Sequence, residues 1–532
     1  MESDAAPGLF DPAAARSTLF SALIDAGRRH GAGTTVLEDA ERQPLTYGRL
    51  LLGGIVLGGK LAQQTMRGET VCVLLPNVNA LAVTLLGLNA WGRVAALLNF
   101  TAGSRNLEAA LDTAMIGLVV TSRRFVETAK LDDVVAAFAR RKTAAGKPVR
   151  VLYLEDVRKT ITAGDKILGL VRAKVAARWH RGHAQSPDSP AVVLFTSGTE
   201  GLPKAVVLSS TNLVSNARQI FAHATPHFTP ADIAFNPLPM FHSFGLTAGT
   251  LMPILNGMRT VLYPSPLHYK QITRLVRDTG ATVLFATDTF AQGYARAADT
   301  GDLASLRFII CGAERVKETT RALYEQAGTL LLEGYGATEC SPVVACNLPG
   351  RNRPGTVGPT LPGLETRLEQ VEGIAAGGRL EVRGPNIMLG YMVHSAPGII
   401  EAPREGWHDT GDIVTIDDGF ITIRGRAKRF AKIGGEMVSL AAVEALASTL
   451  WPDTNHVCVA LPDPRKGEQL ALVTEKPDAD KDALLAEARK EGFPELWVPK
   501  LILVVASIPV LGSGKVDLRA TQQLVRETRT LL

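Results

Sequence analysis

Short apolar runs alternate with helix-length stretches over most of this chain. Five of these runs are rich in valine, leucine, isoleucine and phenylalanine, and they lie at residues 71–75, 119–120, 151–154, 283–285 and 308–310. Short buried strands separated by helical segments are the pattern of βαβ units. The sequence therefore predicts an α/β fold with largely parallel sheets flanked by helices.

The pattern changes near Gly378. Residues 378–383 and 420–424 alternate polar and apolar positions, which predicts a small antiparallel sheet with one exposed face. A chain of 532 residues is also too long for one ordinary core. We therefore expect a large domain at residues 1–425, a boundary at 426–428, and a small α+β domain at 429–532.

Composition limits the cellular setting. The five cysteines are scattered without a C-x-x-C pair, which favours a reducing compartment over a disulfide framework. The longest apolar stretch, residues 81–98, is interrupted by Asn89 and Arg93, and the amino terminus lacks the features of a signal peptide. We expect a cytoplasmic protein.

Positive charge is concentrated in one segment. Residues 123–183 hold fifteen lysines and arginines against six aspartates and glutamates. Within it, basic and apolar positions alternate over residues 166–183, as in a helix that lies on the inner face of an anionic membrane or meets an acidic partner. A solvated helix face is the alternative. No nucleic-acid-binding module accompanies this charge, so nucleic acid is not an expected partner.

A polar, glycine-containing segment follows the apolar run at residues 191–195. Its sequence is T-S-G-T-E-G-L-P-K, and its candidate anion-binding residues are Thr196, Ser197, Gly198, Thr199, Gly201 and Lys204. Hydroxyls and backbone N–H groups can donate to a phosphate where glycine lets the backbone come close. The spacing differs from that of the mononucleotide loop G-x-x-x-x-G-K-[ST]. Taken alone, the segment could be a polar turn.

Four further motifs follow in order. They are G-Y-G-A-T-E at residues 334–339, W-H-D-T-G-D at 407–412, G-R-A-K at 425–428 and L-G-S-G-K at 511–515. Together with the first segment, they resemble the signatures of the adenylate-forming superfamily, which makes an acyl-adenylate from a carboxylic acid and ATP and then usually passes the acyl group to a thiol. The resemblance implies ATP and Mg²⁺ as cofactors.

The resemblance also implies roles for individual residues. Tyr335 would stack on adenine, Thr338 would contact the α-phosphate, and Glu339 would hold Mg²⁺. Asp412 would accept hydrogen bonds from the ribose, with Arg426 donating to the same sugar and Lys428 at the hinge. The remaining nucleotide-binding residues on this basis are Gly312 and Gly336.

Two half-reactions are implied, and the small domain would move between them. Lys515 would bridge the acid and the α-phosphate during adenylation. Lys432 would approach the nucleotide in the thioester-forming state, while Gly434 and Gly435 would let a pantetheine arm pass. His242, in P-L-P-M-F-H-S-F-G at residues 237–245, would gate the acyl and thiol channels or, alternatively, be a core histidine.

Several further segments of the chain are similar in sequence to one branch of this superfamily. Segments at residues 241–245, 263–269, 384–388, 428–433 and 435–440 resemble the synthetase half of bifunctional 2-acylglycerophosphoethanolamine acyltransferase/acyl-[acyl-carrier-protein] synthetase. The resemblance runs from about residue 18 to residue 517 and leaves no room for the acyltransferase domain. It implies a fatty acid as substrate and acyl carrier protein as the thiol acceptor.

Several alternatives remain open from the sequence. Coenzyme A could replace the carrier protein with the same first half-reaction. A protein that binds an acyl-adenylate without turnover, and luciferase-like oxygenation, share the nucleotide motifs. A serine hydrolase is disfavoured because no G-x-S-x-G segment lies at a strand-to-helix turn.

Overall fold

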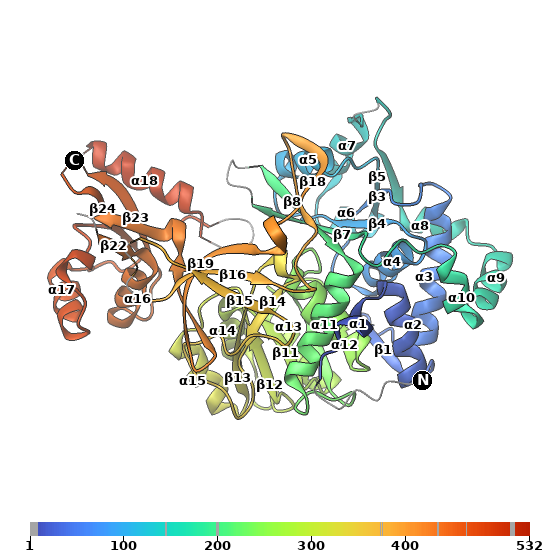
Figure 1. Ribbon diagram of the computed structural model, residues 1–532, viewed down its shortest axis with the longest axis horizontal. Coiled ribbons are helices and arrows are strands. Elements are labelled where there is room, and N and C mark those ends of the chain that lie inside the picture. Colours follow the sequence, from blue (N-terminus) through green and yellow to red (C-terminus); the bar gives the residue numbers. More distant parts are fainter. Residues whose placement is uncertain are drawn as a thin grey trace. The chain divides into compact units, whose positions relative to one another are not determined.

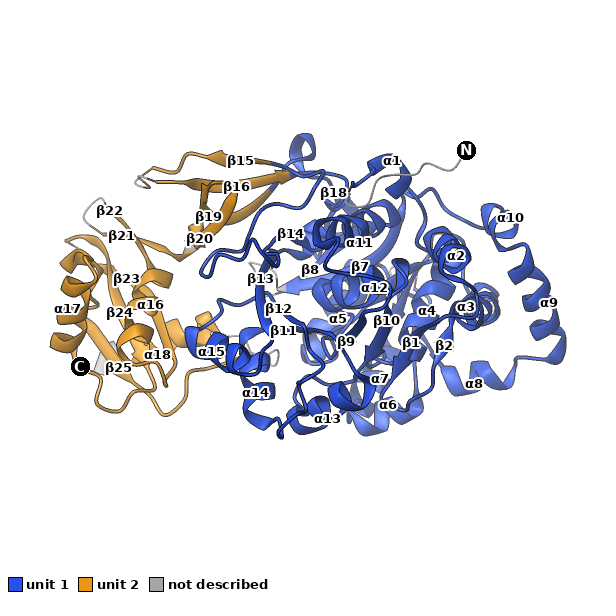
Figure 2. Ribbon diagram, turned by 90° about the horizontal axis from the view of Figure 1, so that it is seen from below, with its two compact units in different colours: residues 1–365, 383–408 blue, residues 366–382, 409–532 orange. Residues whose placement is uncertain are grey.

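The computed structural model describes residues 9–143, 146–197, 202–372, 374, 376–433, 436–463, 465–510 and 516–531. The chain forms two compact units: the first comprises residues 1–365 and 383–408, and the second residues 366–382 and 409–532 (Figure 2). The chain thus leaves the first unit, returns to it, and leaves it again. The predicted boundary at residues 426–428 lies inside the second unit, and the assignment of residues 1–425 and 429–532 to separate domains stays a prediction.

Two eight-stranded sheets form the frame of the described part of the first unit (Figure 1). In spatial order, the first sheet consists of β14 (Val343–Cys346), β13 (Leu330–Gly336), β12 (Phe308–Cys311), β11 (Val283–Ala286), β9 (Ile233–Asn236), β10 (Arg259–Leu262), β1 (Thr35–Asp39) and β2 (Leu45–Thr46). The strands from β13 to β1 pair in parallel, and β14 and β2 join the two edges antiparallel.

The second sheet combines a parallel and an antiparallel half. Its strands, in spatial order, are β18 (Ala396–Glu401), β17 (Gly390–Val393), β8 (Pro203–Ser209), β7 (Pro190–Ser197), β4 (Val94–Leu97), β3 (Thr70–Val73), β5 (Leu118–Thr121) and β6 (Arg150–Tyr153). The half from β7 to β6 is parallel, whereas β8, β17 and β18 are antiparallel. The strands predicted from the apolar runs are therefore confirmed, as is the α/β class.

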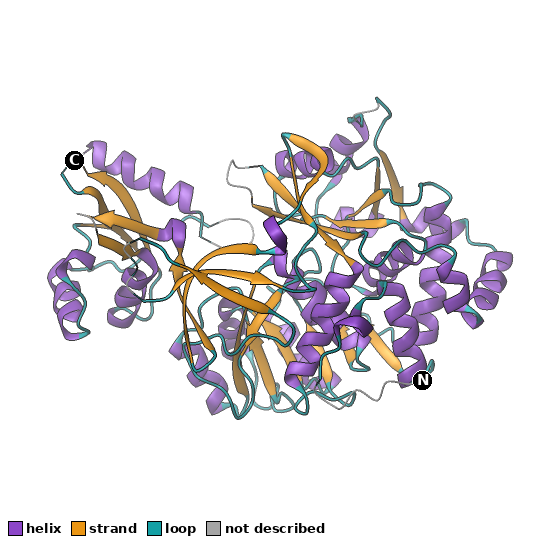
Figure 3. Ribbon diagram, viewed as in Figure 1, coloured by secondary structure: helices purple, strands orange, loops and turns teal. Residues whose placement is uncertain are grey.

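Helices cover both faces of the two sheets (Figure 3). One core contains side chains of both sheets together with those of α2 (Leu19–His30), α3 (Tyr47–Ala62), α4 (Asn79–Ala90), α11 (Ser210–Ala224), the π-helix η1 (Phe244–Leu251) and α12 (Met252–Leu255). The outer helices are α5 (Ser104–Thr113), α6 (Arg123–Thr128) and α7 (Asp132–Arg140) on the second sheet, and α13 (Tyr269–Thr279), α14 (Asp288–Ala297) and α15 (Glu318–Gln326) on the first.

Side-chain alternation along the strands accounts for these layers. Val71 and Val73 of β3 enter the core between the sheets, whereas Cys72 enters the core beneath the outer helices. Successive residues of a strand point to opposite faces, so a run of apolar residues is needed where both faces are covered. The remaining helices of the first unit are α1 (Pro12–Ala15), α8 (Leu154–Lys159), α9 (Ala163–Lys174) and α10 (Ala176–Arg181).

The second unit is built from two smaller sheets. Four strands, β15 (Glu365–Glu369), β16 (Gly378–Arg383), β19 (His408–Asp417) and β20 (Phe420–Arg426), form the first. The second consists of β22 (Glu436–Ser439), β21 (Phe430–Ile433), β24 (Gly467–Thr474), β23 (His456–Asp463) and β25 (Leu501–Val504). Its helices are α16 (Leu440–Leu450), α17 (Lys481–Lys490) and α18 (Leu518–Leu531), with α16 and α17 in one core and α18 in the other.

No helix in the described ranges is long and apolar enough to cross a membrane.

A buried ion pair holds the strand that leads into the G-Y-G-A-T-E motif. The Arg321 Nη2 atom on α15 lies 2.5 Å from Glu333 Oε1 on β13, and the two side chains are 5% and 8% exposed. Glu333 Oε1 also accepts a hydrogen bond from the Gly355 N–H at 3.0 Å. Removing one partner of such a pair leaves an uncompensated buried charge.

We expect Arg321→Met to destabilise the protein by about 3–5 kcal/mol, seen as a fall of several degrees in Tm. Burial raises the pKa of Glu333 above its ordinary value, so keeping this carboxylate charged costs stability that is present at low pH and is lost as the pH rises from the ordinary pKa toward the raised one. The loss should therefore be smaller at about pH 5 than at about pH 8. Thermal unfolding at both pH values measures this, and a double variant with Glu333→Gln should recover most of the loss. An equal loss at both pH values would contradict the explanation.

Candidate active site

The first motif connects two antiparallel strands. β7 and β8 are paired in register, with Thr196 opposite Lys204 and Ser197 opposite Pro203. Thr196, Ser197 and Lys204 therefore lie at the two ends of one short connection. Three predicted anion-binding residues, Gly198, Thr199 and Gly201, lie outside the described residues. The predicted strand before the motif is confirmed as β7. The motif is followed by a second strand, β8, whereas a mononucleotide-binding loop is followed by a helix.

Lys204 contacts an aromatic side chain that sequence reasoning did not single out. Its Nζ atom lies 5.1 Å from the centroid of the Tyr391 ring. Tyr391 is on β17, which pairs with β8 so that Tyr391 stands opposite Val206. A cation at this distance from a ring face is attracted by the negative face of the π-system. The lysine, itself on β8, is thus held against a side chain of β17.

Tyr391 also reaches the predicted metal ligand. Its hydroxyl donates a 2.6 Å hydrogen bond to Glu339 Oε1. Lys204, Tyr391 and Glu339 therefore form a chain of contacts between two motifs that are far apart in the sequence. Such a bond fixes one carboxylate oxygen and leaves the other to bind a ligand.

The G-Y-G-A-T-E motif lies on a tight hairpin. β13 ends at Gly336, a 3-10 turn spans Thr338–Cys340, and β14 returns antiparallel, with Tyr335 opposite Ala345. A Cβ atom at Gly336 would lie 2.2 Å from the Pro342 carbonyl oxygen, so only glycine fits. Tyr335 is 9% exposed, which leaves little of its surface for stacking on a base. Stacking of Tyr335 on adenine therefore stays a prediction.

The loop before η1 meets the same motif. Ser243 Oγ lies within hydrogen-bonding distance of Thr338 Oγ1, at 3.3 Å. Gly312 follows β12, and a Cβ atom there would lie 3.3 Å from the Phe244 ring and 3.4 Å from the Gly334 carbonyl oxygen. The structure thus brings Gly312, Ser243 and the motif together in the first unit.

His242 is exposed, with its ring 4.7 Å from that of Phe241. The alternative of a core histidine is therefore wrong, and the gating role stays a prediction.

The nearby cysteines are not set up as nucleophiles. Cys340 is fully buried in the turn after Glu339, and burial raises the pKa of the Cys346 thiol to about 12. A thiol with so high a pKa carries almost no thiolate at neutral pH. A reaction that needs a sulfur nucleophile here would take it from a substrate.

Asp412 and Arg426 lie opposite each other in the second unit. They are register partners on β19 and β20, and Arg426 Nε lies 3.2 Å from Asp412 Oδ1. The Asp412 side chain is 7% exposed and that of Arg426 is 71% exposed. Two groups predicted to bind the same sugar are thus adjacent, with the guanidinium at the surface.

The remaining predicted residues are on the same unit. Lys428 is in the 3-10 turn Ala427–Arg429. Lys432, on β21, is exposed, and its Nζ atom lies 3.8 Å from Glu372 Oε1. Gly434, Gly435 and Lys515 lie outside the described residues.

The residues that are described fit a magnesium nucleotide. Mg²⁺ keeps several waters and binds through one or two carboxylates plus phosphate oxygens. Glu339 can supply one such carboxylate, because Tyr391 occupies only one of its oxygens. Over the described ranges, no group of three or more histidine, cysteine, aspartate or glutamate side chains could enclose a metal. A cation here would therefore depend on phosphate oxygens as well as on Glu339.

Comparison with known proteins decides the family. The model of the AMP-binding enzyme family matches residues 24–392, which is more than half of the chain. The chain belongs to the AMP-binding enzyme family. The predicted resemblance to adenylate-forming enzymes is confirmed at this level.

Several proteins with assigned activities resemble the chain over most of its length. A long-chain-fatty-acid–CoA ligase of Yersinia pestis is 26% identical over 483 residues, covering 85% of this chain and 84% of its own. A feruloyl-CoA synthase of an Amycolatopsis species is 28% identical over 487 residues, covering 89% and 92%. The ATP-bound structure of MatB from Rhodopseudomonas palustris has a TM-score of 0.78 at 24% identity, covering 96% and 98%, which establishes the shared fold.

Tyr391 and Ser243 are the site residues that sequence reasoning missed. Tyr391 comes shortly after the segment at residues 384–388, which resembles one branch of the superfamily, and it lies 52 positions after Glu339. The pair Gly390-Tyr391, just after that segment, is the signal that the sequence offers. A contact between residues so far apart depends on the pairing of β17 with β8, which local patterns do not reveal.

Replacing Tyr391 with phenylalanine tests whether its hydroxyl positions Glu339 for the predicted Mg²⁺ site. The ring and its contact with Lys204 would remain, whereas the bond to Glu339 would be lost. Loss of a hydrogen bond to a charged group costs about 1.5–3 kcal/mol. We expect the Mg²⁺ concentration needed for half-maximal turnover to rise about tenfold, with a smaller effect at saturating Mg²⁺.

Tyr153→Phe is the matched control, because Tyr153 also has a cation over its ring, Arg123 at 4.0 Å. An unchanged Mg²⁺ requirement in Tyr391→Phe would remove the positioning role. An equal rise of the Mg²⁺ requirement in Tyr391→Phe and Tyr153→Phe would also contradict the positioning role.

Proposed function

We propose that this protein is an AMP-forming ligase that activates a fatty acid with ATP and transfers it to a phosphopantetheine thiol. The observation that carries the proposal is the chain of contacts from Lys204 through Tyr391 to Glu339. It joins a cation of the phosphate-binding segment to the carboxylate best suited to a phosphate-bound metal. The family match over residues 24–392 supports the same chemistry.

In the first half-reaction, a carboxylate oxygen of the acid would attack the α-phosphorus of ATP, and pyrophosphate would leave. Thr196, Ser197 and Lys204 would bind the phosphates, while Thr338, in contact with Ser243, would donate to the α-phosphate. Glu339 would hold Mg²⁺, which would neutralise phosphate charge when bound. Asp412 and Arg426 would hold the ribose, and Lys515 would bridge the two reacting anions.

In the second half-reaction, the thiolate sulfur of the acceptor would attack the acyl carbon, and AMP would leave. Lys432 would then approach the nucleotide while the arm passed along Gly434 and Gly435. The small domain at residues 429–532 would present these two sets of residues in turn.

The acceptor has two candidates. The segments at residues 241–245, 263–269, 384–388, 428–433 and 435–440 favour acyl carrier protein, as in the synthetase half of the bifunctional enzyme. The relatives from Yersinia pestis and Amycolatopsis are named as coenzyme A enzymes, which favours coenzyme A. The two acceptors share the same thiol, so one mechanism serves either.

Product analysis separates these possibilities. The purified protein is incubated with ATP, Mg²⁺ and a panel of fatty acids of different length plus ferulic acid, with coenzyme A, holo acyl carrier protein, or neither. We expect a fatty acyl thioester with at least one acceptor. Thioester with coenzyme A alone, or with carrier protein alone, assigns the acceptor. Thioester of ferulic acid without any fatty acyl product would contradict the proposed substrate class.

A further inference from the structure

Helix α9 presents an outward row of large apolar side chains. Ile167, Leu170, Val171 and Val175 are 63%, 52%, 56% and 52% exposed. The first three recur at spacings of three and four residues, so they share one side of the helix, and Val175 follows directly after its end. Soluble surfaces seldom gather several exposed aliphatic side chains in one patch, and such patches commonly mark interaction sites.

The opposite side of α9 is packed against α3, so the outward row is a fixed feature. A Cβ atom at Gly169 would lie 2.5 Å from Val56 Cγ2 and 3.0 Å from Leu52 Cδ1 of α3. Lys60 Nζ of α3 lies 2.7 Å from Asp165 Oδ2, and this hydrogen bond holds the pKa of Asp165 at about 2. The helix is thus held close to α3 at both its middle and its first turn.

The charge around the apolar row is positive. Residues 166–181 contain five basic side chains and no acidic one, and the basic residues are Lys166, Arg172, Lys174, Arg178 and Arg181. Lys174 lies within the apolar row, where its long stem can lie along apolar surface while the ammonium reaches a polar layer. Aliphatic side chains bordered by cations match the interface of a bilayer that contains anionic lipid.

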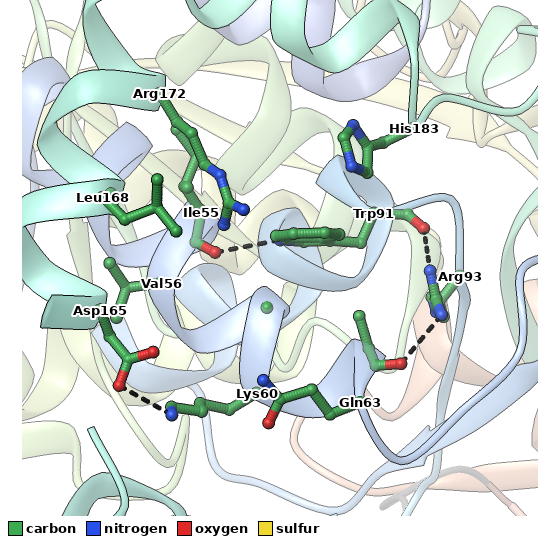
Figure 4. A pocket seen from close by; sticks show the side chains of 13 residues that line it. Ile55, Val56, Lys60, Gln63, Trp91, Arg93, Asp165, Leu168, Arg172 and His183 are labelled. Atoms are coloured by element: carbon green, nitrogen blue, oxygen red, sulfur yellow. Dashed lines mark hydrogen bonds and ion pairs between the residues drawn. The ribbon is translucent and has the colours of Figure 1, made fainter. Parts of the chain in front are cut away.

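A cavity of about 450 Å³ opens between α3 and α9, next to this face (Figure 4). Its walls include the apolar Ile55, Val56 and Leu168 and the ring of Trp91. The Arg172 guanidinium points into it, 5.1 Å from the centroid of the Trp91 ring.

Cations exceed acids in the cavity wall. Asp165, the acid in the cavity, is paired with Lys60, so the charges of Arg172 and Arg93 are in excess. Arg93 donates to the carbonyls of Ala62 and Thr65. In the part of the chain that is described, no carboxylate pairs with Arg172. The cavity therefore suits an anionic group that has apolar surface beside it.

We propose that the outward face of α9 docks the protein on a phospholipid bilayer that carries anionic lipid, with the cavity between α3 and α9 receiving a headgroup phosphate. The exposed aliphatic side chains enter the interface, Lys166 and Lys174 bind the anionic surface, and Arg172 contacts the phosphate. The proposal does not depend on the ligase chemistry, because none of the motif residues lines this cavity.

Vesicle sedimentation of the full chain tests the proposal. Wild-type protein should bind vesicles of phosphatidylcholine with phosphatidylglycerol, bind phosphatidylcholine alone much less, and be released by salt. Ile167→Ser/Val171→Ser and Lys166→Glu/Lys174→Glu should each lower binding by at least about tenfold. Arg172→Gln should lower the preference for phosphatidylglycerol.

Two control pairs match these changes elsewhere on the protein. Leu267→Ser/Ile399→Ser alters aliphatic side chains that are 63% and 66% exposed, and Lys130→Glu/Lys481→Glu reverses two exposed charges. Both should bind as wild type does. No binding by the wild type, or equal loss in the control pairs, would overturn the proposal. Binding of holo acyl carrier protein that the α9 variants lose, with vesicle binding unchanged, would assign this face to an acidic protein instead and also overturn it.

Discussion

Lys515→Ala is expected to lower fatty-acid-dependent pyrophosphate release by about 10²–10³-fold, the usual loss when one preorganised group facing developing charge is removed. The side chain would otherwise offset the repulsion between the carboxylate and the α-phosphate. The same variant should still form thioester from a chemically supplied acyl-adenylate, because that step involves a different pair of reactants. Measuring both half-reactions in one preparation checks the assignment.

Lys500→Ala and Lys432→Ala are the comparisons for this experiment. Lys500 is an exposed lysine of the second unit outside every motif, and its replacement should leave both half-reactions unchanged. Lys432→Ala should slow thioester formation from acyl-adenylate more than it slows adenylation. Equal losses in both half-reactions for Lys515→Ala would contradict the assignment of Lys515 to adenylation and Lys432 to thioester formation.

Asp412→Asn should raise the KM for ATP by about 10- to 100-fold, because hydrogen bonds to a charged acceptor contribute about 1.5–3 kcal/mol. The substitution keeps the shape of the side chain and removes the charge that faces Arg426 at 3.2 Å. Because a nearly buried carboxylate is replaced by a neutral amide of the same size, the fold should persist. Initial rates over a range of ATP concentrations, with Tm recorded alongside, measure the effect.

Asp409→Asn is the control, since Asp409 is on the same strand and lies 3.4 Å from the guanidinium of Arg379. It is exposed, and its Oδ1 atom accepts a hydrogen bond from the Gly411 N–H, which an asparagine oxygen can also do. We expect little change in KM for Asp409→Asn. A matching rise in KM in the two variants would show that local charge, not ribose binding, explains the effect.

Much of the fold follows from local patterns. Strands such as Val283–Ala286 and Phe308–Cys311 are buried on both faces, so they appear in the sequence as unbroken apolar runs. Residues 378–383 and 420–424 became strands β16 and β20. β16 alternates buried and half-buried positions, as a period of two requires, whereas β20 begins with two buried residues, Phe420 and Ile421. The pair Asp412 and Arg426 could likewise be placed together, because both belong to motifs with one implied ligand.

Long-range pairing could not be predicted in this way. β17 and β18 follow the change of pattern near Gly378, yet they return to the second sheet of the first unit beside β8. The order of polar and apolar residues over 390–401 does not specify β8 as the pairing partner. The contacts of Tyr391 with Lys204 and Glu339 depend on this pairing, which is why the residue was missed. The cavity beside α9 likewise depends on how closely Gly169 packs against α3.

Formation of acyl-AMP is the most direct test of the proposed ligase. The protein is incubated with ATP, Mg²⁺ and a fatty acid without any thiol, and the quenched mixture is analysed by mass spectrometry for fatty acyl-AMP and by enzymatic assay for pyrophosphate. We expect both products in equal amounts, dependent on the acid and strongly reduced in Lys515→Ala. Nucleotide binding without acyl-AMP, or acyl-AMP unaffected by Lys515→Ala and Asp412→Asn, would contradict it.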